Sequence, residues 1–268
     1  MNLDELRTKP HLSASSIRDY IECGLLYKLS RVDKLPPAFK SDALVFGNAM
    51  HKAVADFNQN RIEGRLLPVN EFQAAFTGYW AAAAKDNQGI RYKNGNTYQS
   101  LLEQGKNLLE VYHQNFNTKD DEFTVLAIEE PFLMSVEGVA VPMIGAMDLV
   151  EVDSQGTLIV SDFKTASKAY SVDEVQRNFQ MTMYHMATKS NGYAGKEILL
   201  RFDCLVKTKK PKFEQYYTSR SDADEKRTVK KIQKVWEGIS KGVFIPNDMG
   251  WRCVDCAYRV YCDEYLQN

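Results

Sequence analysis

The feature that most constrains the fold of this chain is a change of pattern at Phe123. Before it, apolar residues recur at helical spacing, whereas short β-branched and apolar runs of strand length follow it. The expected segments are strands at 123–136, 139–152 and 157–163, a helix at about 172–189, strands near 197–206 and 213–218, and a charged helix at about 222–241. Three strands, a helix and then further strands predict an α/β fold with a mixed sheet.

The first 120 residues are predicted to be largely helical. Ser13 has the position of an N-cap before an amphipathic helix that carries Cys23 near its end. A second helical stretch opens at Gly47 and places His51 beside its apolar face. A third helix is expected from Tyr98 to Phe116.

The length of 268 residues and the hydrophobic content of 44% favour one elaborated domain over residues 1–268. Its expected parts are a helical part at 1–120, a core at 121–220, and a helix with a cysteine cluster at 221–268. No run approaches the roughly 20 apolar residues of a membrane span, and the beginning of the sequence is polar. We therefore expect a cytoplasmic protein that does not enter a membrane.

The net charge of -1 gives no global indication of a nucleic-acid partner. Locally, residues 196–241 contain 13 Lys and Arg against 7 Asp and Glu. Such a surplus fits a nucleic-acid-binding surface, and it fits a solvated helix face equally well.

The triplet Asp162, Phe163 and Lys164 ends an apolar strand. Alternation along the strand sends Asp162 and Lys164 to one side and Phe163 to the other, toward the core. An Asp and a Lys so placed can hold a divalent cation and put a positive charge beside a water nucleophile or a phosphorane. Taken alone, the same triplet is more often a surface ion pair.

A second acid, Asp148, is flanked by apolar residues in the preceding strand. Burial of this carboxylate is unfavourable unless a cation compensates its charge, and a metal would do so. A four-residue turn at 153–156, however, pairs Asp148 with Ser161 and puts Asp148 and Asp162 on opposite faces. A three- or five-residue turn, or a β-bulge, is required to bring the two acids together.

Two further groups of polar residues could belong to the same site. Gln180 and Tyr184 stand four apart on the expected helix, so they share a face and could steer a DNA strand or support the lysine. A polar edge with a core-flanking tyrosine is the alternative. Glu129 and Glu130, on an earlier strand, are candidates for a further acid.

Four of the five cysteines have a spacing that indicates a metal site. Cys253, Cys256 and Cys262 give C-x2-C-x5-C, and Cys23 lies 230 residues upstream. Four thiolates can hold either an iron-sulfur cluster or a structural zinc, and both remain open at this point. Cys204 lies within an apolar strand and is interpreted as a small buried hydrophobe.

Taken in order, the polar motifs resemble those of the RecB-type branch of the PD-(D/E)XK nucleases. The family motifs are GxxxH on a helix, GxxD on a strand, (D/E)xK on the next strand and QxxxY on the following helix. Their matches here are Gly47 to His51, Gly145 to Asp148, Asp162 to Lys164, and Gln180 to Tyr184. The resemblance implies a restriction-endonuclease-like core from about Phe123 to Phe213.

The resemblance also implies the roles of these residues. The implied ligands of Mg²⁺ or Mn²⁺ are His51, Asp148, Asp162 and the Phe163 carbonyl. Lys164 would position the attacking water or help to deprotonate it, and Gln180 and Tyr184 would contact the substrate. An imidazole ligand favours manganese.

The cysteine layout is similar to that of the iron-sulfur members of this branch, namely AddB and the CRISPR-associated exonucleases. It implies a 4Fe-4S cluster on Cys23, Cys253, Cys256 and Cys262, in a C-terminal iron-sulfur segment. The relatives usually have proline after the first cysteine, where this chain has Gly24. A cluster that closes so long a loop would act as a structural clasp.

For function, the resemblance implies an exonuclease that acts on DNA that is single-stranded or has free ends. The processes it suggests are recombination, repair, phage DNA processing and CRISPR spacer acquisition. No GxxxxGK[ST] motif is present, so the expected partners include a helicase, a recombination protein or a CRISPR adaptation protein. The alternatives are a metal-dependent RNase and a non-catalytic iron-sulfur or zinc protein that binds nucleic acid.

Overall fold

The computed structural model describes residues 2–86, 89–117 and 123–267. The chain forms two compact units. The central unit consists of Ser41–Glu130 and Ala146–Arg220, and the terminal unit consists of Met1–Lys40, Pro131–Gly145 and Ser221–Asn268. The expectation of a single domain remains a prediction.

Residues 123–218 contain five strands that form one sheet in the order β3-β4-β5-β6-β7. The strands are β3 (Phe123–Met134), β4 (Met143–Asp153), β5 (Leu158–Ala166), β6 (Ile198–Val206) and β7 (Lys212–Thr218). The β4/β5 and β6/β7 pairs are antiparallel and the β5/β6 pair is parallel. The sheet is therefore mixed, as predicted, and each strand lies close to its predicted range.

The turn between β4 and β5 holds five residues, 153–157, because Val152 pairs with Leu158. The Asp153 carboxylate shapes this turn by accepting hydrogen bonds from the backbone N–H groups of Gln155, at 2.9 Å, and Thr157, at 2.8 Å. Gly156 supplies the left-handed backbone, with φ of +85°.

This turn length sets the register of the two acids. Leu149 pairs with Ser161, so the next step along both strands brings Asp148 opposite Asp162. The turn is not the four-residue turn that pairs Asp148 with Ser161, so the required departure from that turn is confirmed. A five-residue turn is one of the arrangements that put the two acids on one side, and it is the one the structure contains.

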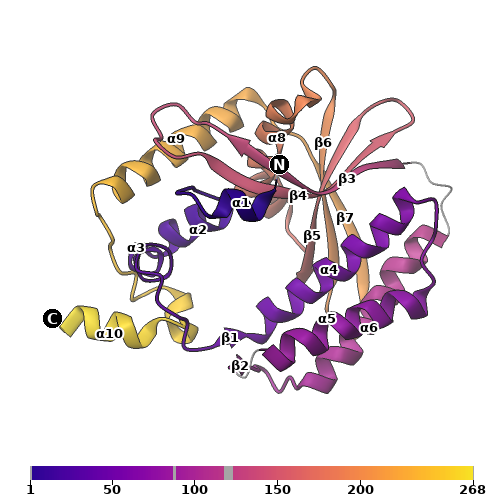
Figure 1. Cartoon of the computed structure of the whole chain (residues 1–268), viewed down its shortest axis with the longest axis horizontal. Helices are drawn as coiled ribbons and strands as arrows, with labels where there is room; N and C mark the ends of the chain where they lie inside the picture. The colour runs from indigo at the N-terminus through magenta and orange to yellow at the C-terminus, as the bar shows by residue number, and fades with distance from the viewer. Residues whose placement is uncertain (1, 87–88, 118–122, 268) are drawn as a thin grey trace. The chain divides into compact units, whose positions relative to one another are not determined.

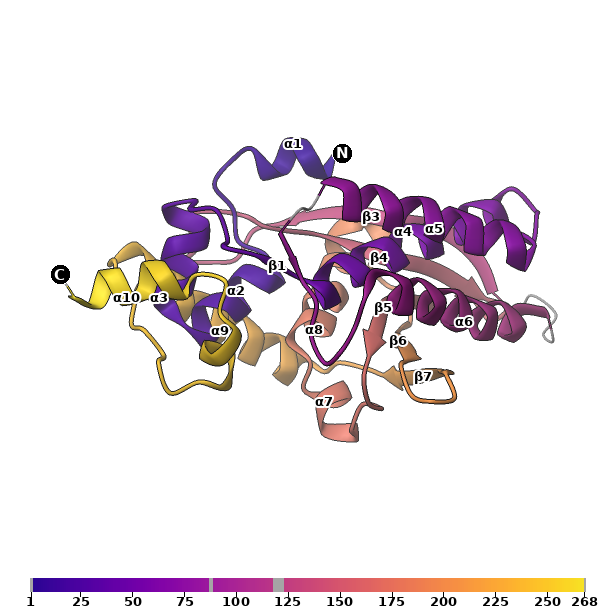
Figure 2. The same ribbon diagram turned by 90° about the horizontal axis from the view of Figure 1, so that it is seen from below.

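In the central unit, helices α4 (Asp42–Ile62), α5 (Val69–Asp86) and α6 (Tyr98–Asn117) lie side by side (Figures 1 and 2). Their core includes Phe46, Phe57, Phe72, Phe76, Trp80 and Tyr112, together with Phe163 and Leu205 from the sheet. Phe163 thus points toward the helical core, as predicted. The short strands β1 (Lys40–Ser41) and β2 (Ile90–Arg91) pair with each other.

The predicted helix at 172–189 is two helices, α7 (Val172–Gln176) and α8 (Phe179–Thr188). The break occurs because Asn178 has an extended backbone and caps α8 by accepting from the Met181 N–H at 3.2 Å. A π-helical segment, η2 (Lys189–Tyr193), follows α8. Helix α8 contacts β5 and β6 on the face opposite α4–α6, since Asp162 points to α8 and Phe163 points away from it.

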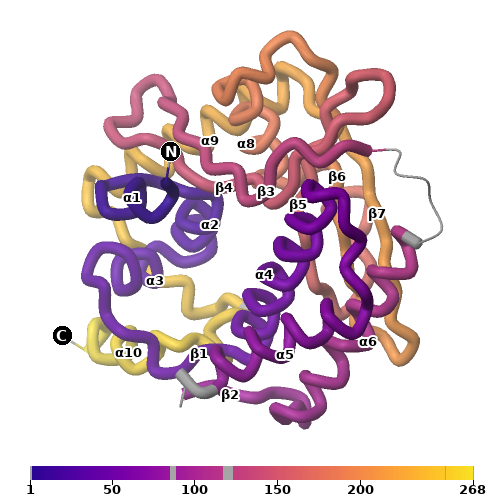
Figure 3. The backbone as a smooth tube through the Cα atoms, turned by 45° about the vertical axis from the view of Figure 1, so that its right-hand side comes forward, coloured from indigo at the N-terminus to yellow at the C-terminus, as the bar shows by residue number. Residues whose placement is uncertain are grey.

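The terminal unit contains α1 (Leu3–Arg7), α2 (Ala14–Glu22), α3 (Gly24–Tyr27), η1 (Lys28–Val32), α9 (Asp222–Ser240), η3 (Trp251–Asp255) and α10 (Arg259–Gln267). Ser13 caps α2 through a capping box with Ser16, which confirms the predicted helix start. The Tyr20 hydroxyl donates to the Val243 carbonyl at 2.6 Å. Figure 3 shows that the first and last segments of the chain run together within this unit.

No helix within the described ranges has both the length and the apolar character that a membrane crossing requires.

Candidate active site

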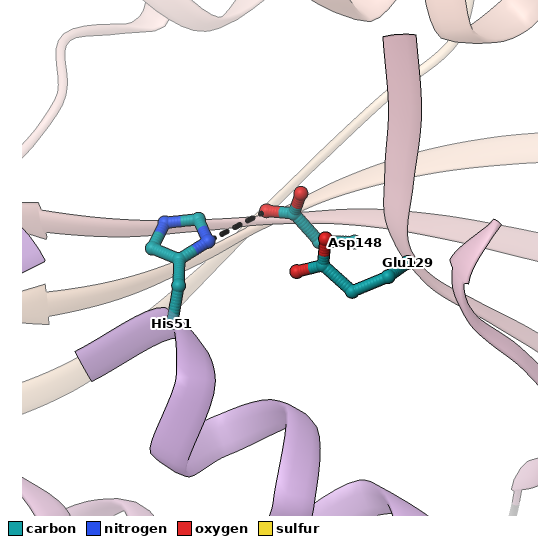
Figure 4. Close-up of side chains that lie close together, drawn as sticks. All are labelled: His51, Glu129 and Asp148. Carbon is teal, nitrogen blue, oxygen red and sulfur yellow. Dashed lines mark ion pairs between the residues drawn. The ribbon is translucent and has the colours of Figure 1, made fainter. Parts of the chain in front are cut away.

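Three side chains from different elements of the central unit meet at one point (Figure 4). His51 comes from α4, Glu129 from β3 and Asp148 from β4, and one ligand atom of each lies within 4.8 Å of the other two. The His51 Nδ1 and Asp148 Oδ2 atoms are 3.5 Å apart. Among the described residues, this is the group of His, Cys, Asp and Glu side chains close enough to share one metal ion.

Glu129 reaches this group through an unusual backbone conformation. Its φ is +50°, a left-handed value that non-glycine residues in strands rarely adopt. The regular alternation of β3 is interrupted at this residue, and the carboxylate faces Asp148 (Figure 4). The neighbouring Glu130 instead accepts hydrogen bonds from Asn191, at 3.1 Å, and Tyr193, at 3.0 Å. Of the two acids raised as candidates, Glu129 therefore lies at the site.

The predicted Asp-x-Lys pair forms the adjacent part of the site. The Lys164 Nζ lies 2.7 Å from Asp162 Oδ2 and donates to Gln180 Oε1 at 3.3 Å. Gln180 Nε2 donates to the Tyr184 hydroxyl at 2.9 Å, and that hydroxyl donates to Asp162 Oδ1 at 3.4 Å. The four side chains close a ring in which Gln180 and Tyr184 hold the lysine and the acid.

Phe163 joins the two groups. Its backbone N–H donates to Asp148 Oδ2 at 2.9 Å, and His51 forms a hydrogen bond to its backbone. Its ring packs edge-on against the His51 imidazole, with centroids 5.1 Å apart. The backbone at Phe163 is therefore directly beside His51 and Asp148.

A buried ion network fixes α4 to the sheet. Arg61, near the end of α4, binds Glu151 of β4 at 2.9 Å. Arg201 of β6 binds the same carboxylate at 2.6 Å and Asp203 at 2.9 Å, and its side chain is 2% exposed. Removal of one partner would leave a buried charge uncompensated, so the network holds the helix of His51 against the strand of Asp148.

Burial and mutual repulsion dominate the electrostatics. Burial, and then the charge of Asp162, raises the pKa of Asp148 well above its ordinary value, more than Lys164 and the Phe163 N–H lower it. Burial alone would lower the pKa of Lys164, but the Asp162 and Asp148 carboxylates outweigh it and raise that pKa. Burial lowers the pKa of His51. The site therefore has an excess of buried acid and a neutral imidazole.

These residues fit a divalent cation. Asp162 is 0% exposed, and its Oδ2 has no hydrogen bond of good geometry to a described residue, although the Lys164 ammonium is close. Two buried carboxylates beside one lysine, one of them an acid of raised pKa, leave negative charge that a further cation would stabilise. Carboxylate and carbonyl oxygens with one imidazole suit Mg²⁺ or Mn²⁺.

In the terminal unit, four free cysteines line one cavity of about 270 Å³. They are Cys23, Cys253, Cys256 and Cys262. The Cys23 sulfur accepts hydrogen bonds at 3.4 Å from the backbone N–H groups of Leu26 and Asn247. Cys204 is fully buried in β6, as predicted.

Gly24, which follows Cys23, lies against the chain at 244–245. A Cβ atom on Gly24 would lie 2.8 Å from the Ile245 nitrogen and 3.1 Å from the Phe244 Cα. No side chain fits there without moving the backbone. The glycine thus allows the segment that precedes the C-terminal cysteines to approach Cys23 closely.

A mixed sheet that carries acids and a lysine on adjacent strands, between helices on both faces, defines a restriction-endonuclease-like fold. The profile of the PD-(D/E)XK nuclease superfamily matches residues 11–263, and the chain belongs to this superfamily.

Among solved structures, the chain is similar to a "Putative exonuclease" from Eubacterium rectale, with 14% identity and a TM-score of 0.57, over 96% of this chain and 91% of that chain. At this identity the likeness shows the fold. The structure of SSO0001 matches with 15% identity over 88% of this chain and 92% of that chain, but its TM-score is 0.34. No curated protein matches the chain.

Proposed function

We propose that this nuclease is a metal-dependent deoxyribonuclease that degrades DNA from free ends or as single strands. The observation that carries the proposal is the meeting of His51, Glu129 and Asp148 within 4.8 Å, beside the Asp162–Lys164 pair. Superfamily membership supports phosphodiester hydrolysis. The exonuclease mode rests on the family resemblance and on the name of the Eubacterium rectale protein.

The proposed ligands of Mg²⁺ or Mn²⁺ are His51, Asp148, Asp162 and the Phe163 carbonyl, to which Glu129 is now added. When bound, the cation would neutralise charge on the phosphate and make water more acidic. The neutral state of His51 favours ligation, because an imidazolium has no lone pair to offer.

Lys164 is proposed to position the attacking water and to stabilise the negative charge that develops on the phosphate. Its raised pKa keeps it protonated, so it acts as a hydrogen-bond donor and a positive charge rather than as a free base. Burial raises the pKa of Tyr184 well above its ordinary value, and the charges of Asp148 and Asp162 add to this effect. The tyrosine therefore remains a donor to Asp162, while Gln180 orients the lysine.

The first test compares wild type with Lys164→Ala on end-labelled single- and double-stranded DNA, with Mg²⁺ or Mn²⁺. Loss of the positive charge should reduce the cleavage rate by about 10²–10³-fold without unfolding the protein. Lys226→Ala, an exposed lysine of α9, is the matched control. Equal rates for Lys164→Ala and wild type would remove the lysine from the reaction, and an RNA competitor would separate a DNase from an RNase.

We further propose that the cysteine cavity holds a 4Fe-4S cluster. A tetrahedral zinc site would draw four sulfurs to about 3.8 Å from one another, given a Zn–S bond of about 2.3 Å. The thiols here share a wider cavity and do not form a group of ligand atoms within 4.8 Å among the described residues. The spacing therefore favours the larger cluster, and metal analysis for iron or zinc distinguishes the two.

A further inference from the structure

The segment that joins β6 to β7 is strongly basic. Residues 207–212, here called the lysine loop, read Lys-Thr-Lys-Lys-Pro-Lys and contain no acid. Lys209 and Lys210 are exposed, and no described carboxylate lies within 4.0 Å of either ammonium. In a chain with a net charge of -1, four lysines in six residues form a distinctly positive local surface.

The lysine loop is fixed to both elements that carry the catalytic candidates. The Lys207 N–H donates to the Ala166 carbonyl at 2.7 Å, which extends the pairing of β5 with β6. The Lys207 ammonium lies over the Phe46 ring of α4, 5.3 Å from its centroid. Within the loop, the Thr208 hydroxyl donates to the Lys210 carbonyl. The tip is therefore held in place relative to Lys164 on β5 and His51 on α4.

The direction of the strands sets the distance from the tip to the site. Strands β5 and β6 are parallel, and Lys164 pairs with Cys204. Lys209 and Lys210 lie five and six residues beyond Cys204, which corresponds to at most roughly 17–20 Å at about 3.3 Å per residue. A DNA strand whose cleaved bond lies at Lys164 could therefore place a phosphate at the loop tip only a few nucleotides from that bond.

The rest of the basic region is less suited to this role. Lys234 of α9 and its C-cap residue Lys241 both pair with Glu237, at 2.6 and 2.7 Å. These ion pairs offset part of the basic surplus on α9, whereas Lys209 and Lys210 at the loop tip pair with no carboxylate in the described part of the chain. The loop belongs to the same compact unit as the candidate site, whereas α9 belongs to the terminal unit.

We propose that the lysine loop binds the phosphodiester backbone of a single strand a few nucleotides from the bond that is cut. The inference rests on the proposed nuclease function and adds to it the surface that holds the strand. Lys209 and Lys210 contact phosphates through charge, so the loop is expected to bind without regard to sequence.

The test compares Lys209→Gln/Lys210→Gln with the control Lys226→Gln/Lys230→Gln, which removes the same charge from exposed positions on α9. Binding of a labelled single strand of about 20 nucleotides is measured by fluorescence anisotropy in EDTA over a range of salt. The loop variant should bind about tenfold more weakly than wild type. The slope of the logarithm of its binding constant against the logarithm of the salt concentration, here called the salt slope, should fall in magnitude by about 1.4, or about 0.7 per lost phosphate contact. The control should stay within about twofold of wild type, and Lys209→Arg/Lys210→Arg should restore binding.

If Lys209→Gln/Lys210→Gln binds the single strand with the affinity and salt slope of wild type, the lysine loop is not the binding surface. A second readout is cleavage with metal, where the defect should be at least fivefold larger on the long strand than on a trinucleotide that cannot reach the tip. Equal defects on both substrates would also overturn the inference. If wild type binds through the loop but cuts nothing, the nuclease proposal fails while the loop assignment stands.

Discussion

At the scale of single residues, the site contains groups whose conformation and charge are unfavourable without a ligand. The left-handed backbone of Glu129 costs on the order of 1–3 kcal/mol, and Asp148 lies opposite another buried acid. Of the two motif glycines, Gly145 is required sterically, because a Cβ would lie 2.6 Å from the Phe132 ring, whereas at Gly47 the nearest atom would be 3.8 Å away. Strain and repulsion thus concentrate where a cation is expected to bind.

Replacement of Asp148 by Asn should stabilise the metal-free protein by about 0.5–2 kcal/mol at neutral pH. Because the native pKa of Asp148 is raised, its ionisation destabilises the folded state progressively as pH rises above the ordinary pKa of about 3.9. The difference between variant and wild type should therefore vanish at low pH and grow as pH increases. Thermal unfolding in EDTA at several pH values measures it.

With Mn²⁺ present, wild type should be more stable than the Asp148→Asn variant, because only the wild-type carboxylate can ligate the ion fully. The stabilisation of wild type by Mn²⁺ should also increase with pH. A variant that is less stable than wild type in EDTA at every pH would contradict this account of the site.

At the scale of elements, the turn of β4 and β5 decides whether the acids meet. If the turn keeps its five residues after deletion of Gln155, Val152 pairs with Ile159 in place of Leu158, and this shift of the register by one sends one acid to the other face. The deletion should abolish cleavage and lower the thermal stability, while Gln155→Ala, an exposed change, should stay within about 0.5 kcal/mol of wild type. Cleavage assays and melting curves measure both effects. Full activity in the deletion variant would show that the five-residue length of the turn does not set the register of the two acids.

Much of the sheet and the main site could be predicted because strand alternation and motif order are local in sequence. Helix α5 was missed although Phe72, Phe76 and Trp80 recur every four residues, and α4 begins at Asp42, before Gly47, because Ser41 caps it. The turn length could not be predicted, since it depends on hydrogen bonds to one Asp153 side chain. The position of the Glu129 carboxylate depends on the left-handed φ angle of this residue, which no residue spacing in the sequence predicts.

At the scale of the whole molecule, the two compact units carry different chemistry. The central unit holds the acids, the lysine and the lysine loop, and the terminal unit holds the four cysteines. In the terminal unit the Ala38 N–H donates to the Ala257 carbonyl at 2.9 Å, and Lys28 lies over the Tyr265 ring. These contacts join the two sequence ends, and residues of both ends line the cysteine cavity.

Cys256→Ser should remove the brown colour and the bound iron of protein purified without oxygen, and it should lower the melting temperature, because ligation adds to folding energy. Iron analysis, visible absorption and melting curves measure the three effects. Cys204→Ala, a buried cysteine outside the cavity, should keep the colour. A colourless, stable and fully active wild type that contains zinc would exclude the cluster.

The positions of the four cysteines in the sequence also set an order of events during synthesis. Cys23 leaves the ribosome about 230 residues before Cys253, which at about 5–20 residues per second is a wait of roughly 10–50 s. The continuous stretch 146–220 and the helices of 41–117 are complete well before then. Any metal delivered to the four thiols must therefore arrive after translation has passed Cys262, onto a chain whose nuclease core is already able to fold.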